Sequence, residues 1–509
     1  MKRLTAASLL LGTALVVTGC APAVDPGWTP PTWPAAQVQV LAAAPAPLDA
    51  TTLPLTPQRI SSSGVQARMA YLPGTAGAAK AFNSRIDGLV RTAAGNSYEP
   101  AVGVQGAGLG DRGCVQGSTL RPAAEVLADP VLGPGDGVAV VCDVVFAGGD
   151  VLGQRVRVVA GTADAIAADT STVLYVDTAS GEVADGAGLW ADGAGVTLRD
   201  DVVEAIRRDA GALGLAPIAP PDEAQAALIA AGLADTVPGA DGGLVFTLPA
   251  GFSTPELVDL GVAATPEPLV IEVPGNLVAE LGSPFGQRIA EASGSPYTGP
   301  AAVPAGRDWV DCTLLPCVAL TYDDGPSNLT GRLLDEYAEA HAAATFFMLG
   351  QYASRNPDMV RRVAAEGHVI GSHTWDHPSL PGLDDAEISR QLTRTRSVLR
   401  ELSGQAVATF RPPYGEYNAR VLSAAGQPAI LWSVDTRDWA GPADDVLLTR
   451  AIDEPNPGGI VLFHDTHERS VRLAPAIIAG LRDRGFTPVT ITQLFDGTLP
   501  TSGAWRSAG

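Results

Sequence analysis

The chain has 509 residues and a formal net charge of −22, with 33 Lys and Arg against 55 Asp and Glu. Such an acidic surplus repels phosphate backbones and therefore argues against a nucleic acid as partner. The length exceeds one ordinary domain and is enough for at least two buried cores.

The first residues are typical of an export signal. Lys2 and Arg3 supply positive charge, an apolar run follows over 9–17, and the tetrapeptide VTGC that ends at Cys20 resembles a bacterial lipobox. The alternative is an uncleaved membrane anchor, but the run is shorter than the roughly 20 residues of a spanning helix. The sequence thus predicts a signal peptide over 1–19 and a lipid anchor at Cys20. The protein would lie on the outer face of the cytoplasmic membrane, or be secreted if the lipobox is not used.

Residues 20–50 are rich in Ala and Pro and predict an extended tether. An α+β accessory domain is expected over 51–293, followed by a linker over 294–310. The elements expected in this domain are helices over 77–93 and 200–213 and strands over 138–146, 154–160, 172–177, 244–248 and 269–273.

Four cysteines remain besides Cys20, an even number that in an exported protein favours disulfides. The simplest pairing joins Cys114 to Cys142 and Cys312 to Cys317. Zinc ligation by these thiols is the alternative, although neither pair has CxxC spacing and no histidine lies nearby.

From 311 to 496 strands and helices alternate, which predicts a parallel sheet closed into a distorted (β/α)7-type barrel. The chain as a whole is therefore expected to be α/β in class, and 497–509 to form a C-terminal tail. Strands are expected over 318–322, 344–347, 369–372, 409–410, 429–433, 460–463 and 488–491, and helices over 329–340, 357–366 and 385–402.

All six histidines lie between His341 and His467, so the chemistry is expected in this third of the chain. His373 and His377 are four apart, and one helical turn would place both imidazoles on one side. Asp323 and Asp324 follow an earlier strand, although Asp-Gly-Pro is also good turn material. Asp324 with the two histidines makes a metal site with open positions, as in catalytic metal centres.

Three further groups follow later strands. Arg411 precedes two prolines that stiffen its loop, Asp438 and Trp439 follow a strand, and Leu462 and His464 close another. Taken singly, Arg411 would be a solvated surface group, Trp439 a core residue and His464 a structural histidine.

In order, TYDDGP, HTWDH, RPPYG, DTRDW and LFH resemble the five motifs of the polysaccharide deacetylase family, the NodB-homology group or carbohydrate esterase family 4. The resemblance covers about 311–496, and DCTLLPC resembles a cysteine pair found before the first motif in some members. Tyr322 stands where phenylalanine is usual, and a buried hydroxyl there needs a partner.

The resemblance implies a role for each residue. Asp324, His373 and His377 would bind a divalent cation, for which zinc is expected in preference to cobalt or another metal. Asp323 would be the catalytic base, and Arg411 would hold its carboxylate in place. His464 would be the acid, paired with Asp438, and the Tyr414 backbone N–H would stabilise the oxyanion. Trp439 and Leu462 would form apolar walls of the substrate site.

The expected substrate is cell-wall peptidoglycan, de-N-acetylated at N-acetylglucosamine or N-acetylmuramic acid. Chitin deacetylases and xylan acetyl esterases share the motifs and stay open as alternatives. The accessory domain weakly resembles extracellular domains that contact wall glycan or lysozyme. A non-catalytic lipoprotein that senses glycan or lysozyme, and a non-haem iron oxygenase with two histidines and one carboxylate, are the rival classes.

Overall fold

The computed structural model describes residues 36–102, 112–211 and 218–508. In these ranges no helix is both long enough and apolar enough to span a bilayer. Cys20 and the predicted signal peptide lie outside the described residues, and the lipid anchor stays a prediction.

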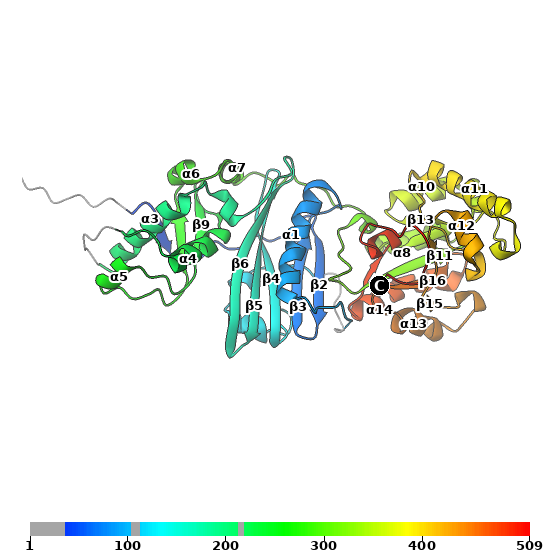
Figure 1. Ribbon diagram of the computed structural model, residues 1–509, viewed down its shortest axis with the longest axis horizontal. Helices are drawn as coiled ribbons and strands as arrows, with labels where there is room; N and C mark the ends of the chain where they lie inside the picture. Colours follow the sequence, from blue (N-terminus) through cyan, green and yellow to red (C-terminus); the bar gives the residue numbers. More distant parts are fainter. Residues whose placement is uncertain (1–35, 103–111, 212–217, 509) are drawn as a thin grey trace, which may run out of the picture. The chain divides into compact units, whose positions relative to one another are not determined.

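The first folded region contains a six-stranded sheet with helix α1 lying against it (Figure 1). Phe82, Ile86 and Val90 repeat at helical spacing and give α1 one buried stripe. All neighbouring strands are antiparallel except β3 and β4, which are parallel. The sheet runs β2 (Thr56–Ser62), β3 (Val65–Tyr71), β4 (Asp136–Gly148), β5 (Val151–Thr162), β6 (Ala165–Asp177) and β7 (Val183–Asp185), with α1 (Gly77–Ala94) and α2 (Ala123–Ala128) beside it.

A second, antiparallel sheet has the order β1-β10-β9-β8. The predicted tether is wrong over its last part, because β1 (Gln39–Leu41) pairs with β10 (Leu269–Val273). The alternation QVQVL over 37–41 is a strand pattern that the surrounding Ala and Pro obscure. The other elements are β9 (Leu244–Leu248), β8 (Val237–Pro238), α3 (Ala194–Asp209), α4 (Glu223–Ala234), α5 (Pro255–Asp259), α6 (Gly275–Leu281) and α7 (Pro284–Ala292).

The C-terminal region is built on parallel strands in the order β13-β12-β11-β16-β15, with β17 beside the start of β11. Phe410 bridges Ser372 of β13 and Ala429 of β14, so the curved sheet continues beyond β13. Helices surround the strands (Figure 1). The strands are β11 (Cys317–Asp323), β12 (Thr345–Met348), β13 (Val369–Ser372), β14 (Ala429–Ile430), β15 (Val434–Asp435), β16 (Gly459–His464) and β17 (Thr487–Val489).

The strands of this region carry near-continuous buried residues, because helices cover the sheet. The α/β class predicted from the sequence is confirmed. The helices are α8 (Thr330–Glu339), α9 (Gly350–Arg355), α10 (Pro357–Ala365), α11 (Asp385–Ser403), α12 (Ala419–Ala425), α13 (Asp444–Asp453), α14 (Glu468–Asp483) and α15 (Ile491–Leu494).

Three expectations about the strands differ from the structure. The strand expected over 409–410 is reduced to the single bridge at Phe410. The strand expected over 429–433 is two short strands, because Leu431 N–H bonds the Trp505 carbonyl whereas Ser433 N–H bonds that of Ile460. The predicted tail is instead part of the fold, since β18 (Ala504–Trp505) pairs in parallel with β14.

Both predicted disulfides are confirmed. Cys114 and Cys142 are joined across a separation of 28 residues, and Cys312 and Cys317 across a separation of 5. The second bridge closes the loop that enters β11, the strand that carries the acidic pair.

Candidate active site

The candidate active site lies at the carboxyl ends of the parallel strands. Asp323 ends β11 and is in register with His464, which ends the neighbouring β16, and His373 directly follows β13. Reactive groups gather at this edge in parallel α/β folds. A cavity of about 500 Å³ opens there, lined by Asp323, Asp324, His373, His377, Pro412, Tyr414, Trp432, Asp435, Trp439, Leu462 and His464.

Asp324, His373 and His377 form a group able to hold a metal ion, with ligand atoms all within 4.8 Å of one another. Asp324 Oδ1 lies 3.5 Å from His373 Nε2 and 3.6 Å from His377 Nε2. Bonds of roughly 2.0–2.2 Å at tetrahedral angles would place ligand atoms about 3.3–3.6 Å apart. The two distances from Asp324 Oδ1 match this spacing, so the three residues would be able to hold one cation. Asp324 Oδ1 is buried with no hydrogen-bond donor among the described residues.

A hydrogen bond fixes which ring nitrogen of His373 faces the candidate cation site. The Nδ1–H donates to the Arg411 carbonyl at 2.8 Å, so Nε2 keeps its lone pair toward Asp324. Burial lowers the pKa of His373 to about 3, although the charge of Asp324 opposes the shift. The imidazole is thus neutral, as a metal ligand must be.

The helical turn predicted for the HxxxH segment is wrong. Residues 373–377 form a loop in which Thr374 and His377 both have positive φ, 68° and 67°. The Thr374 hydroxyl accepts a hydrogen bond from the His377 backbone N–H at 3.1 Å and so stabilises this turn. The two imidazoles converge because the loop folds back, with their ring centroids 4.9 Å apart.

Asp323 and Arg411 form a buried ion pair. Arg411 Nη1 lies 2.9 Å from Asp323 Oδ1 and also donates to the Thr321 hydroxyl. Its Nε and Nη2 donate to the carbonyls of Ile430 and Leu431, both at 2.9 Å. Burial raises the pKa of Asp323 above its ordinary value, and the guanidinium opposes that rise. The arginine therefore keeps the orientation of the carboxylate fixed at the cavity floor.

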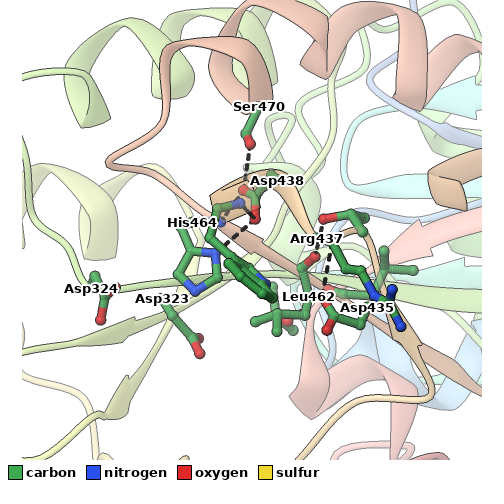
Figure 2. Close-up of polar contacts among 12 residues, drawn as sticks. Asp323, Asp324, Asp435, Arg437, Asp438, Leu462, His464 and Ser470 are labelled. Atoms are coloured by element: carbon green, nitrogen blue, oxygen red, sulfur yellow. Dashed lines mark hydrogen bonds and ion pairs between the residues drawn. The ribbon is translucent and has the colours of Figure 1, made fainter. Parts of the chain in front are cut away.

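His464 and Asp438 form a second pair, and the His464 ring lies beside Asp323 (Figure 2). His464 Nδ1 and Asp438 Oδ1 are 2.8 Å apart. Burial works against a charged imidazole, but the hydrogen bond and charge of Asp438, with the charges of Asp323 and Asp324, raise the pKa of His464 to about 9. The ring is therefore protonated at neutral pH and can donate a proton to a ligand in the cavity.

The residues expected to contact substrate have different exposures. Trp439 and Tyr414 present 57% and 65% of their surface to solvent at the cavity rim, whereas Leu462 is 4% exposed in its wall. Trp439 is thus not the core residue that its type alone favours.

Sequence reasoning missed Pro412, Trp432 and Asp435 as cavity residues. Pro412 and Asp435 lie inside the recognised motifs, and their position there was the available signal. Trp432 precedes the fourth motif and carries no such signal. Gly325 was also missed: a Cβ there would lie 2.3 Å from Asp465 Oδ2, so only glycine fits beside this buried carboxyl group.

The polysaccharide deacetylase family model matches residues 311–429. The chain is 38% identical to a peptidoglycan-N-acetylglucosamine deacetylase of Bacillus cereus, over 35% of this chain and 68% of the relative. It is 37% identical to a chitooligosaccharide deacetylase of Rhizobium leguminosarum bv. trifolii, over 35% of this chain and 90% of that protein.

The chain belongs to the polysaccharide deacetylase family. It is also 37% identical to a peptidoglycan-N-acetylglucosamine deacetylase of Listeria monocytogenes, where the match covers 36% of this chain and 39% of the relative. Each of these matches covers a little over a third of this chain.

Proposed function

We propose that the chain is a metal-dependent de-N-acetylase that removes acetyl groups from N-acetylated amino sugars of peptidoglycan and releases acetate. The observation that carries the proposal is that two proton-transfer groups, Asp323 and His464, line the same cavity as the three residues that could hold a cation. An amide hydrolase needs this set, because a water must lose a proton and a departing amine must gain one. Two relatives named as peptidoglycan-N-acetylglucosamine deacetylases support the substrate.

We infer that Asp324, His373 and His377 hold a zinc ion, because one carboxylate and two imidazoles are a ligand set that zinc accepts in catalytic sites. A cation held there lowers the pKa of a water and polarises the acetamide carbonyl. Metal analysis of the purified protein, with loss of activity on chelation and recovery with zinc, tests the identity of the ion.

The chain's own residues would divide the remaining work. Asp323 accepts the proton of the attacking water, and its ion pair with Arg411 holds the carboxylate still. The Tyr414 backbone N–H stabilises the charge that develops on the carbonyl oxygen. His464, protonated at neutral pH, gives its proton to the departing sugar amine. Trp439 and Leu462 confine the sugar and its acetyl methyl group in the cavity.

The deciding experiment measures acetate release from purified peptidoglycan and from chitooligosaccharides. Muropeptide mass spectrometry then identifies which sugar carries the free amine. Release from neither glycan would contradict the proposal, and release from chitooligosaccharides alone would favour the second candidate, which the Rhizobium relative supports. An oxygen requirement with no acetate release would instead favour the iron oxygenase class.

We also propose that Cys20 anchors the protein on the outer face of the cytoplasmic membrane, where it would meet cell-wall glycan. The support is the apolar segment and lipobox of the N-terminus. Metabolic labelling with a fatty-acid probe, lost in Cys20→Ala, tests it. Contact of the accessory region with wall glycan or lysozyme stays a prediction, to be tested by binding of each to the purified protein.

A further inference from the structure

The carboxylate of Asp438 accepts four hydrogen bonds. Oδ1 accepts from His464 Nδ1 at 2.8 Å and from the Trp439 backbone N–H at 2.9 Å. Oδ2 accepts from the His464 backbone N–H at 2.7 Å and from the hydroxyl of Ser470 at 2.5 Å. Each carboxylate oxygen therefore accepts two hydrogen bonds, and Asp438 is 3% exposed.

Ser470 differs from the other donors to Asp438 because it lies on a different element of the fold. The backbone donors belong to residues 439 and 464, the neighbour of Asp438 and its histidine partner. Ser470 lies on α14, outside the five recognised motifs, and is fully buried. Figure 2 shows Asp438 between the Ser470 hydroxyl and the His464 ring. The serine thus connects a separate helix to the face of the carboxylate that points away from the imidazole Nδ1.

This arrangement limits how the carboxylate can turn. Rotation about the Cβ–Cγ bond of Asp438 would break the bond from the Ser470 hydroxyl, which is a hydrogen bond to a charged oxygen and of the stronger kind. With Oδ2 held, Oδ1 stays directed at Nδ1, and the remaining nitrogen of His464 stays directed into the cavity. A carboxylate behind a catalytic imidazole acts by fixing the orientation and protonation of the ring.

We propose that Ser470 is a positioning residue for proton donation, which holds the Asp438 carboxylate so that His464 stays oriented and protonated. The proposal rests on the proposed function, because it assigns His464 the role of acid. Ser470 itself touches neither the cavity nor the reacting atoms.

The charged groups around His464 decide the direction of the expected change. Asp438 faces it from the turn after β15, Asp323 and Asp324 from the end of β11, and the ring of His467 lies 5.6 Å away. Asp465 is the next residue in the chain and is fully buried. Only Asp438 is hydrogen-bonded to the ring among the described residues, so its displacement is expected to lower the pKa of His464.

The test compares Ser470→Ala with Ser470→Thr, which keeps the hydroxyl, and with Val471→Ala. Val471 is the next residue of α14, is fully buried in the core and has no contact with Asp438 among those described. The readout is the dependence of kcat on pH. In Ser470→Ala we expect the pH at which kcat falls on the alkaline limb of this profile to move down by about one unit, so that kcat on that limb drops about tenfold. KM and metal content should be unchanged. Ser470→Thr should restore the limb, and Val471→Ala should lower thermal stability without moving it.

An NMR titration of the His464 imidazole in the wild type and in Ser470→Ala provides a readout without turnover. A lower His464 pKa in Ser470→Ala supports the proposal even if the wild type deacetylates none of the glycans tested, so that failure of the proposed function is seen separately. An unchanged or higher pKa, or a loss of activity equal to that of Val471→Ala with no shift of the alkaline limb, overturns it.

Discussion

Replacing Asp438 by Asn tests the acid half of the site most directly. The substitution keeps the shape of the side chain but removes the charge that holds His464 protonated. The pKa of His464 is raised to about 9 in the folded protein. Without the Asp438 charge we expect the pKa of His464 to return to its ordinary value of about 6.5 or below, because burial lowers this pKa and the carboxylate that chiefly raises it is gone.

The size of the effect follows from the two pKa values. At pH 8 the protonated fraction of His464 would fall from about 0.9 to about 0.03, a loss of about 30-fold in the competent form. At pH 6 both forms are mostly protonated, and the loss from this cause is only about 1.3-fold. The activity deficit of Asp438→Asn should therefore grow about 20-fold between pH 6 and pH 8.

The assay is the initial rate of acetate release, measured across this pH range for the wild type and for Asp438→Asn at equal metal content. A deficit of the same size at both pH values would refute the reasoning, because it would mean that Asp438 does not act through the protonation of His464. Loss of bound metal in the variant would point to a change of structure at the cation site instead.

The same pair predicts how stability depends on pH. Because the folded pKa of His464 lies above its unfolded value, the pair stabilises the fold fully below about pH 6.5 and loses this contribution as pH rises through about 9. The difference of about 2.5 units corresponds to about 3 kcal/mol. Asp87 and Asp465, whose pKa values burial raises to about 7, lose stability over the same range in both proteins. Urea unfolding at pH 6 and pH 9 should therefore show the wild type losing about 3 kcal/mol more than Asp438→Asn.

Three other predictions concern separate parts of the molecule. Asp323→Asn should keep its metal and lose nearly all turnover, and near wild-type acetate release would show that Asp323 is not the base. Loss of the Cys114–Cys142 bridge should destabilise the fold by about 4 kcal/mol and loss of the Cys312–Cys317 bridge by about 2 kcal/mol, since the first closes the longer loop. Urea unfolding of a variant with both cysteines of one bridge replaced by Ser measures each loss. Equal losses for the two bridges would contradict the prediction. Truncation after Pro500 removes β18 and should slow turnover, because β14 then loses the strand that supports the carbonyls bound by Arg411; an unchanged kcat would show that β18 is dispensable.

Several strands of both folded regions could be predicted because their pattern is local. Strands 369–372 and 244–248 match the structure at both ends, since short buried runs with clear flanking residues carry their own signal. The hairpin of β2 and β3 was missed, because its strands contain Arg59, Arg68 and Gln58 at buried positions. Polar and charged residues at buried strand positions interrupt the alternation of apolar and polar residues by which a strand is recognised in a sequence.

The Tyr322 departure shows how packing answers a question that the sequence only raises. Its buried hydroxyl is 3.1 Å from that of Tyr337 on α8, which supplies the required partner. The ring stacks between Phe346 and Phe463 from the two neighbouring strands. Nothing near Tyr322 in the sequence identifies Tyr337, because the pairing depends on where α8 lies against the sheet.

The loops of the site could not be derived from local rules, because they break them. Of the nine non-glycine residues with positive φ in the described ranges, five belong to the catalytic loops: Asp324, Thr374, His377, Tyr414 and Arg437. A side chain in this conformation is disfavoured and persists only where surrounding contacts enforce it. These rules favoured a helical turn for the HxxxH spacing, whereas in the structure residues 373–377 form a loop with positive φ at Thr374 and His377. The strain therefore lies where the ligand atoms must meet, and the buried pairs Arg411–Asp323 and Asp438–His464 are the contacts that hold the neighbouring strand ends in place.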